Sequence, residues 1–138
     1  MNIVIDSNIL FSALIKDSIT RKIILISDSY FLFPLVIFEE MEKYKGDLFR
    51  KSGMDEKSFG ELFNLILKKI VFVPDEVLYS YREDALKLVE KIDINDVAFV
   101  ASVLAYPNSV LWSDDKKLKK LKNVEVLNTK DIIDFLYS

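Results

Sequence analysis

The sequence predicts an α/β protein, a three-layer α/β/α sandwich with a central, mostly parallel sheet of about five strands. Short apolar segments rich in β-branched and aromatic residues alternate with longer segments whose apolar residues have helical spacing. Strands that alternate with helices form βαβ units, and their right-handed crossovers place helices on both faces of a parallel sheet. The 138 residues suit one domain, which we expect to span residues 1–138.

The predicted strands are apolar segments bounded by turn or polar residues, over 3–5, 29–33, 69–73, 109–112 and 124–127. Helices are expected over 9–16, 20–27, 34–45, 55–67, 74–89, 96–106 and 131–137. Leu118 and Leu121 anchor a further short, lysine-rich helix, and Thr20 and Thr129 are suitable N-caps. Segment 46–60 is polar and marked by glycines, so a loop or a short helical excursion is expected there.

Composition restricts the chemistry. The chain contains no cysteine and no histidine, which excludes disulfides, thiol nucleophiles, the usual zinc sites and the commonest general base. Its net charge of −3 argues against binding nucleic acid by bulk charge, so any such contact must be local. We see no signal peptide and no apolar run near the roughly 20 residues that span a bilayer, so a cytoplasmic protein with no membrane partner is expected.

Asp6 and Glu40 are the first two candidate site residues. Asp6 ends the first strand, at the sheet edge where α/β proteins bind ligands, although it is also suited to cap the next helix. Glu40 has apolar residues around it on its helix and is expected to turn inward, where it needs a partner, a proton or a metal. Glu39, by contrast, has Lys43 four residues later, which predicts a surface ion pair.

Two pairs of acids complete the set. Asp93 and Asp96 are suited to start the apolar helix that follows them, but they are also expected at the same sheet edge as Asp6. Asp114 and Asp115 follow the strand that ends at Trp112, where one of them is enough to cap the next helix. Carboxylates gathered at one edge repel one another unless a cation lies among them, and oxygen-only ligands select Mg²⁺ or Mn²⁺. Such an ion lowers the pKa of a bound water and stabilises charge on a phosphate.

These motifs together resemble the PIN-domain nucleases, the family that includes VapC-type toxins. The segments that carry the resemblance are 5–8 (IDSN), 39–41 (EEM), 92–101 (IDINDVAFVA) and 111–118 (LWSDDKKL). The resemblance covers essentially the whole chain. Ser113 stands where threonine is commoner, and acids are doubled at two of the four sites, so the exact ligands are open by one residue. The resemblance implies a PIN-like fold and cleavage of single-stranded RNA by Mg²⁺- or Mn²⁺-activated water, leaving a 5′-phosphate.

The resemblance also implies roles for individual residues. Asp6, Glu40, Asp96 and Asp115 are the expected catalytic and metal-binding acids, while Asn8, Ser113, Asp93 and Asp114 are expected to support them. Many relatives are toxins that an antitoxin protein inhibits and that assemble as dimers, so an antitoxin and a homodimer are the partners to test for.

RNA binding by an acidic protein requires a local basic patch. The basic residues near the predicted site are Lys116, Lys117, Lys119, Lys120, Lys122, Arg50 and Lys51. They are expected to bind the RNA backbone, although the lysines are equally suited to a solvated helix face. Tyr30, Tyr106 and Trp112 are more typical of core packing than of base stacking.

Three alternatives compete with the nuclease hypothesis. An aspartate-based phosphatase needs a second acid two residues after Asp6, where Asn8 stands. A receiver-type phosphoacceptor needs its acid after a middle strand, but the strand over 69–73 ends in residues that open a helix. A PIN-like domain without catalysis, serving as a nucleic-acid or protein binding module, is the remaining alternative, and the four filled acidic positions argue against it.

Overall fold

The computed structural model describes residues 1–137, so the last residue of the predicted domain, Ser138, lies outside the described range. Within that range the chain forms one five-stranded sheet in the order β3-β2-β1-β4-β5, and every adjacent pair is parallel. The strands are β1 (Asn2–Ile5), β2 (Tyr30–Pro34), β3 (Ile70–Val73), β4 (Val110–Trp112) and β5 (Val126–Leu127). The predicted parallel α/β fold is confirmed.

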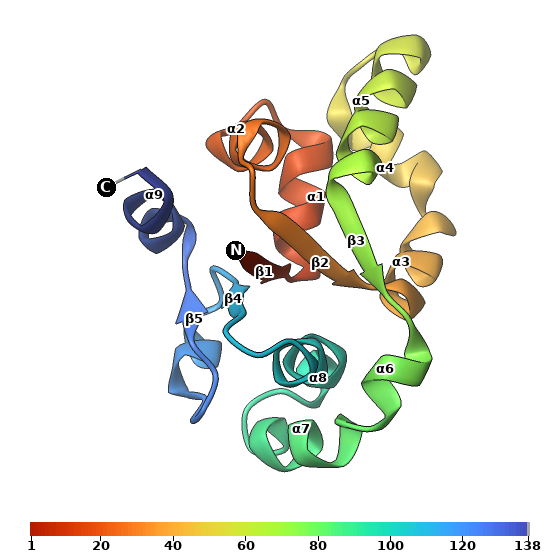
Figure 1. The fold of residues 1–138 in the computed structure, drawn as a ribbon. Helices are drawn as coiled ribbons and strands as arrows, with labels where there is room; N and C mark the ends of the chain where they lie inside the picture. The colour runs from red at the N-terminus through yellow and green to blue at the C-terminus, as the bar shows by residue number, and fades with distance from the viewer. Residues whose placement is uncertain (138) are drawn as a thin grey trace.

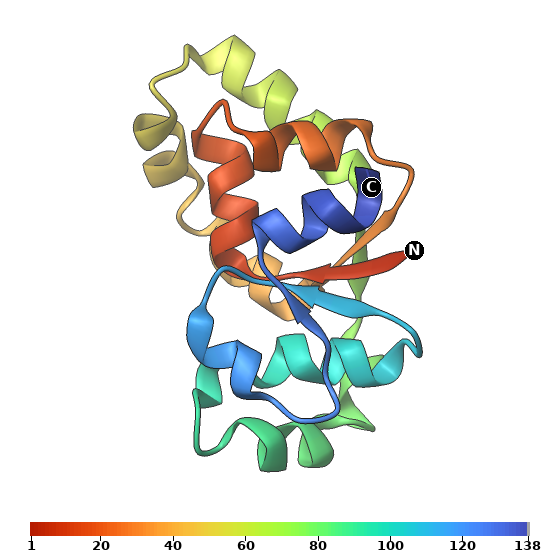
Figure 2. The same ribbon diagram turned by 90° about the vertical axis from the view of Figure 1, so that its left-hand side faces the viewer.

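Helices connect the strands and cover both faces of the sheet (Figures 1 and 2). The α-helices are α1 (Ser7–Ile15), α2 (Ile19–Ile26), α3 (Leu35–Glu42), α4 (Lys45–Ser52), α5 (Glu56–Lys69), α6 (Asp75–Tyr79), α7 (Arg82–Val89), α8 (Val97–Ala105) and α9 (Thr129–Tyr137). Two short 3₁₀ helices, η1 (Ile94–Asp96) and η2 (Lys116–Lys120), lie near the ends of the strands. Helices α1, α2 and α9 lie on one face and α6, α7 and α8 on the other.

Several predicted helix boundaries were wrong. The single helix expected over 74–89 is divided into α6 and α7. Most of segment 46–60 is helical, and the left-handed φ of +68° at Gly53 ends α4, a conformation that glycine adopts without steric cost. Ser18, not Thr20, caps α2, because the Ser18 hydroxyl accepts a hydrogen bond from the Arg21 amide while Thr20 is buried.

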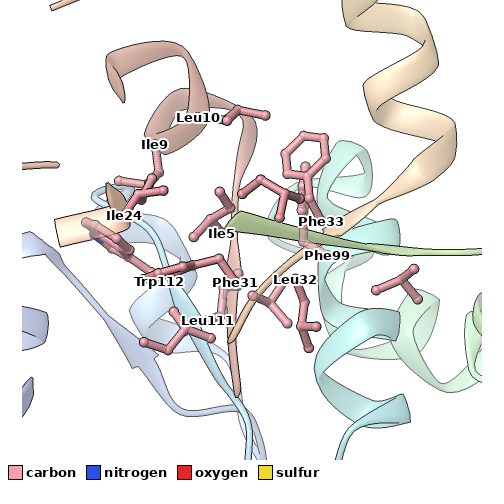
Figure 3. Close-up of a cluster of buried hydrophobic side chains, with 14 of the residues drawn as sticks. Ile5, Ile9, Leu10, Ile24, Phe31, Leu32, Phe33, Phe99, Leu111 and Trp112 are labelled. Carbon is pink, nitrogen blue, oxygen red and sulfur yellow. The ribbon is translucent and has the colours of Figure 1, made fainter. Parts of the chain in front are cut away.

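The core lies on both sides of the three central strands (Figure 3). Trp112 is fully buried, and its ring centroid lies 6.2 Å from that of Phe31. Phe33 of β2 packs against Phe99 of α8 with a centroid distance of 5.7 Å. Trp112 is therefore a core residue, as predicted, whereas Tyr30 is 61% exposed at the start of β2, contrary to the predicted core packing.

All five strands point their carboxyl ends toward one edge, which lies on the left in Figure 2. Val4 of β1 pairs with Leu32 of β2 on one side and with Leu111 of β4 on the other, so the chain order reverses around β1. In open α/β sheets, ligands bind beside the carboxyl ends at such a reversal point. No helix within residues 1–137 combines the length and the apolar character needed to cross a membrane.

Candidate metal centre at the carboxyl edge of the sheet

Asp6 follows β1 directly and is 6% exposed. One oxygen of its carboxylate accepts a hydrogen bond of 3.0 Å from the Ile9 amide, so Asp6 does cap α1, as its position also allowed. Burial raises the pKa of Asp6, the Ser113 hydroxyl and the Ile9 amide lower it, and Asp114 and Asp115 raise it again. The cap fixes the direction of a carboxylate that otherwise lies among acidic and hydroxyl groups.

Asp93, Asp96 and Asp115 form a compact group of carboxylates. Each offers one oxygen, and these three oxygens all lie within 4.8 Å of one another. Asp93 starts η1 by accepting a hydrogen bond of 3.0 Å from the Asn95 amide, and Asp96 lies at the junction of η1 and α8. Asp115 is brought to them by the segment after β4, where it caps η2 through the Lys117 amide at 3.0 Å.

The four acids influence one another electrostatically. Burial raises the pKa of Asp96 to about 6, with further contributions from the negative charges of Asp93, Asp6 and Asp115. Within residues 1–137, the ion pairs of the structure involve other acids, so no lysine or arginine neutralises this group. Carboxylate oxygens without a paired cation are the ligands that hard divalent cations prefer, so the group could hold a metal ion.

The structure distinguishes the two adjacent acids after β4. Asp115 joins the carboxylate group, whereas Asp114 turns toward α9 and accepts hydrogen bonds from the amide of Thr129 at 2.7 Å and from its hydroxyl at 2.8 Å. Ser113, between β4 and these acids, is buried and accepts a hydrogen bond of 3.1 Å from the Asp115 amide. Ser113 therefore contacts the backbone that carries Asp115.

Glu40 is not where the sequence predicted. Its side chain is 63% exposed and pairs with Lys43 at 3.1 Å, so the predicted burial was wrong, and so was the predicted pairing of Lys43 with Glu39. The apolar neighbours that suggested burial include Val36 and Tyr44, which are themselves exposed because α3 buries only Phe38 and Met41. Glu40 does not belong to the group of three carboxylates.

The remaining predicted residues lie around the acids. Asn8 is exposed on the first turn of α1 and lines a cavity of about 470 Å³ together with Lys51 of α4. Arg50 is paired with Asp47 of the same helix, which leaves Lys51 as the freer cation of the two. On η2, Lys116, Lys117 and Lys120 are exposed, while Lys119 pairs with Asp131 of α9.

The sequence predicted only a supporting role for Asp93, yet its carboxylate is one of the three that converge. The spacing of three residues between Asp93 and Asp96 was the available signal, because residues i and i+3 of a short helical turn lie close together. That spacing was also explained by helix capping, which the hydrogen bond from the Asn95 amide confirms. The Asp93 carboxylate therefore caps η1 and also belongs to the group of three carboxylates.

Comparisons with known proteins agree with this architecture. A family model described as PIN domain matches residues 4–132. A chain in the crystal structure of VapBC2 from Rickettsia felis, bound to a DNA fragment from their promoter, superimposes with a TM-score of 0.67 at 15% sequence identity. That superposition covers 93% of this chain and 98% of the other and shows a shared fold. No curated protein matches this chain by sequence.

Proposed function

This chain belongs to the PIN-domain family, and we propose that residues 1–138 form a single metal-dependent endoribonuclease domain that hydrolyses single-stranded RNA. The observation that carries the proposal is the convergence of Asp93, Asp96 and Asp115 beside the buried Asp6, with no cationic side chain among residues 1–137 paired to them. Buried or crowded carboxylates are costly unless a proton or a cation compensates them. A catalytic cation is the use of such a site that agrees with the family.

Asp6, Asp96 and Asp115 are the residues that would hold the ion, with Asp93 close enough to join or replace one of them. Mg²⁺ or Mn²⁺ bound there would supply an activated water and neutralise charge on the phosphate. Glu40 would complete the site only by leaving Lys43, and an exposed pair of this kind costs about 0–1 kcal/mol to break. The Lys43 pair is therefore no large energetic obstacle to that change.

The other groups of the site would position the acids and bind the RNA. The Ile9 amide holds the Asp6 carboxylate in one orientation, and Ser113 fixes the backbone of Asp115, so both acids are placed before the substrate arrives. Asn8 and Ser113 would orient a ligand or a phosphate oxygen. Lys116, Lys117 and Lys120 on η2, with Lys51 on α4, would bind backbone phosphates on either side of the cut.

A protein partner is part of the proposal. Because the superimposed structure is that of VapBC2, we propose that this chain is the toxin of a toxin–antitoxin pair, inhibited by an antitoxin and assembled as a homodimer. The alternative function is a PIN-like binding module without catalysis. The unneutralised acids disfavour it, because a module that only binds RNA gains nothing from negative charge at its binding edge.

The deciding experiment is cleavage of a randomised single-stranded RNA pool in Mn²⁺, compared with chelator and with the Asp6→Asn protein. Asparagine is as good an N-cap as aspartate, so this substitution removes the charge while it keeps the hydrogen bond to Ile9. The matched control is Asp55→Asn, because Asp55 caps α5 in the same way through the Ser58 amide at 2.7 Å but is not part of the acidic group.

The nuclease proposal requires that the wild-type and Asp55→Asn proteins cut in Mn²⁺ and leave 5′-phosphates, while Asp6→Asn does not. Metal binding without cleavage of any RNA would direct the search to a narrow structured RNA or to DNA. A protein that neither cuts nor binds metal would be the binding module.

A further inference from the structure

A second concave site adjoins the acids on the same edge of the sheet. It is a cavity of about 410 Å³ lined by residues of α3, α6, α7, η1 and α8. Of these, α3 and α6 lie beside the carboxyl ends of β2 and β3 in Figure 1. Its floor is apolar, and includes Val36, Leu78 and Ala98, while Tyr79, Asp75, Arg82 and Asn95 line it with polar groups. A volume of this size lies in the range of small-molecule sites in proteins.

Two elements carry residues of this cavity and also residues of the predicted site. Asn95, which lines the cavity, stands between Asp93 and Asp96 on η1, so that single turn serves both sites. Val36, also in the lining, lies one helical turn before Glu40 on α3. The cavity and the acids are therefore neighbours along η1, where Asn95 stands between two of the acids.

The lining has the features of a site for an unstacked nucleobase. Tyr79 is 80% exposed, which leaves its ring available for stacking, and single-stranded RNA is bound largely by bases stacked on aromatic side chains. Asp75 and Arg82 are exposed and, within residues 1–137, neither takes part in an ion pair. An acceptor and a donor of opposite charge are thus both available to one ligand.

We propose that this cavity, lined by Tyr79, Asp75, Arg82 and Asn95, is a guanine-binding subsite for one nucleotide beside the scissile phosphate. Guanine presents two neighbouring donors, N1–H and N2–H, to a carboxylate, and two neighbouring acceptors, O6 and N7, to a guanidinium. Adenine, cytosine and uracil each lack at least one of these pairs. The apolar floor and the Tyr79 ring would enclose the faces of the base.

The subsite deepens the proposed function, on which it rests for its biological meaning. RNA that crosses the carboxyl edge would contact the η2 lysines after β4, then the acids beside β1 and β4, and then the cavity after β2 and β3. The lysines would bind any sequence, since phosphates carry no base identity, and the cavity would then determine where the chain is cut.

The test measures binding separately from cleavage. The protein carries Asp6→Asn so that RNA stays intact in Mg²⁺, and the probes are fluorescently labelled pentauridylates whose central base is U, G, A or C. We expect the G probe to bind on the order of tenfold more tightly than the other three. Tyr79→Ala should weaken binding of all four probes by roughly tenfold, because stacking does not depend on base identity.

Asp75→Asn and Arg82→Gln should each remove most of the preference for G and leave the other probes nearly unchanged. Matched controls lie outside the cavity: Tyr30→Ala at the opposite edge of the sheet, and Asp84→Asn and Lys87→Gln, exposed residues of α7 that do not line it. Equal binding of the four probes, or equal effects of the cavity variants and their controls, would overturn the subsite.

The two proposals fail in different ways. If the unmodified protein cuts the random pool at positions unrelated to G, the nuclease stands and the subsite is wrong. If the protein prefers the G probe in binding but never cuts RNA, the subsite stands and the nuclease proposal is wrong.

Discussion

The carboxylate of Asp114 accepts two hydrogen bonds from Thr129, one from its amide at 2.7 Å and one from its hydroxyl at 2.8 Å. The Thr129 hydroxyl in turn accepts a hydrogen bond of 3.0 Å from the indole Nε1–H of the buried Trp112. Asp114 thus connects the end of β4 to the start of α9, and its carboxylate is not one of the three that converge. Its neighbour Asp115 is the one that approaches Asp93 and Asp96.

This division predicts opposite phenotypes for neighbouring acids. Asp114→Ala should lower the free energy of unfolding by about 1–2 kcal/mol, as the loss of a helix cap does. It should leave the rise in melting temperature caused by Mn²⁺ unchanged, because stabilisation by a ligand depends on its affinity for the folded state. Thermal unfolding with and without Mn²⁺ measures both quantities. The control is Glu125→Ala, which removes an exposed acid directly before β5.

Asp115→Asn should show the reverse behaviour. Asparagine preserves the cap on η2, so stability without metal should be nearly unchanged, but the Mn²⁺-induced rise should be much reduced. The same loss is expected for Asp96→Asn. If Asp114→Ala abolished the metal effect and Asp115→Asn did not, the assignment of the two acids would be reversed.

The fold was predictable because its signals are local and repeated. In β1 the β-branched residues Ile3, Val4 and Ile5 stop at Asp6, and such short apolar strands alternate with helices along the chain. Helix breaks were less predictable. The division between α6 and α7 occurs at Ser80 and Tyr81, without glycine or proline. Both helices pack against α8, and no local sequence pattern records such tertiary packing.

The site was only partly predictable for a similar reason. Asp6 and Asp115 follow strands, and strand ends in a parallel sheet must meet at one edge, so topology alone places them. Glu40 lies on a helix whose apolar residues are not all buried. Whether the Glu40 side chain faces the core or solvent therefore depends on how α3 packs against the rest of the protein. Apolar neighbours in sequence do not establish that a side chain is enclosed.

The raised pKa of Asp96 predicts how stability depends on pH without metal. Its pKa is about 6 in the folded protein against an ordinary value of 3.8, so between these values the folded state keeps a proton that the unfolded state has lost. The contribution of Asp96 to stability should therefore decrease as pH rises from 3.8 to about 6 and then stay constant. Metal affinity should increase over the same interval, since the ligand must lose its proton.

The free energy of unfolding, measured with urea in the presence of chelator from pH 4 to pH 8, tests this pH dependence. The Asp96→Asn protein is the comparison. The variant cannot ionise at this position, so it should gain stability relative to wild type as pH rises toward 6 and keep that advantage above it. Parallel pH profiles for the two proteins would contradict the assignment.

Glu40 provides a test of whether an exposed acid takes part in catalysis. Glu40→Gln should reduce Mn²⁺-dependent cleavage while stability changes by less than about 0.5 kcal/mol, because exposed substitutions rarely cost more. Glu39→Gln, one residue earlier and also exposed, is the matched control and should cut normally. Lys43→Ala should cut at least as well as wild type, since it frees Glu40. Equal activity of Glu40→Gln and Glu39→Gln would remove Glu40 from the site.

The lysines of η2 should not contribute equally to RNA binding. Lys116 and Lys117 are exposed and, among the described residues, form no ion pair, whereas Lys119 is engaged by Asp131, whose pKa this contact lowers. Each single-strand phosphate contact changes the slope of log K against log salt by roughly 0.7. Lys116→Ala and Lys117→Ala should each flatten that slope by about this amount, for every RNA sequence alike.

Lys119→Ala should change the slope less, because its charge is already balanced, and Lys57→Ala on the distant α5 should leave it unchanged. Titrations of one labelled RNA at several salt concentrations, with the Asp6→Asn substitution present to prevent cleavage, give these slopes. If Lys119→Ala had the largest effect, Lys119 would have to exchange Asp131 for phosphate on binding, and α9 would then lose an ion pair whenever RNA is bound. Protection of α9 from hydrogen exchange would decrease in that case, and it should otherwise stay the same.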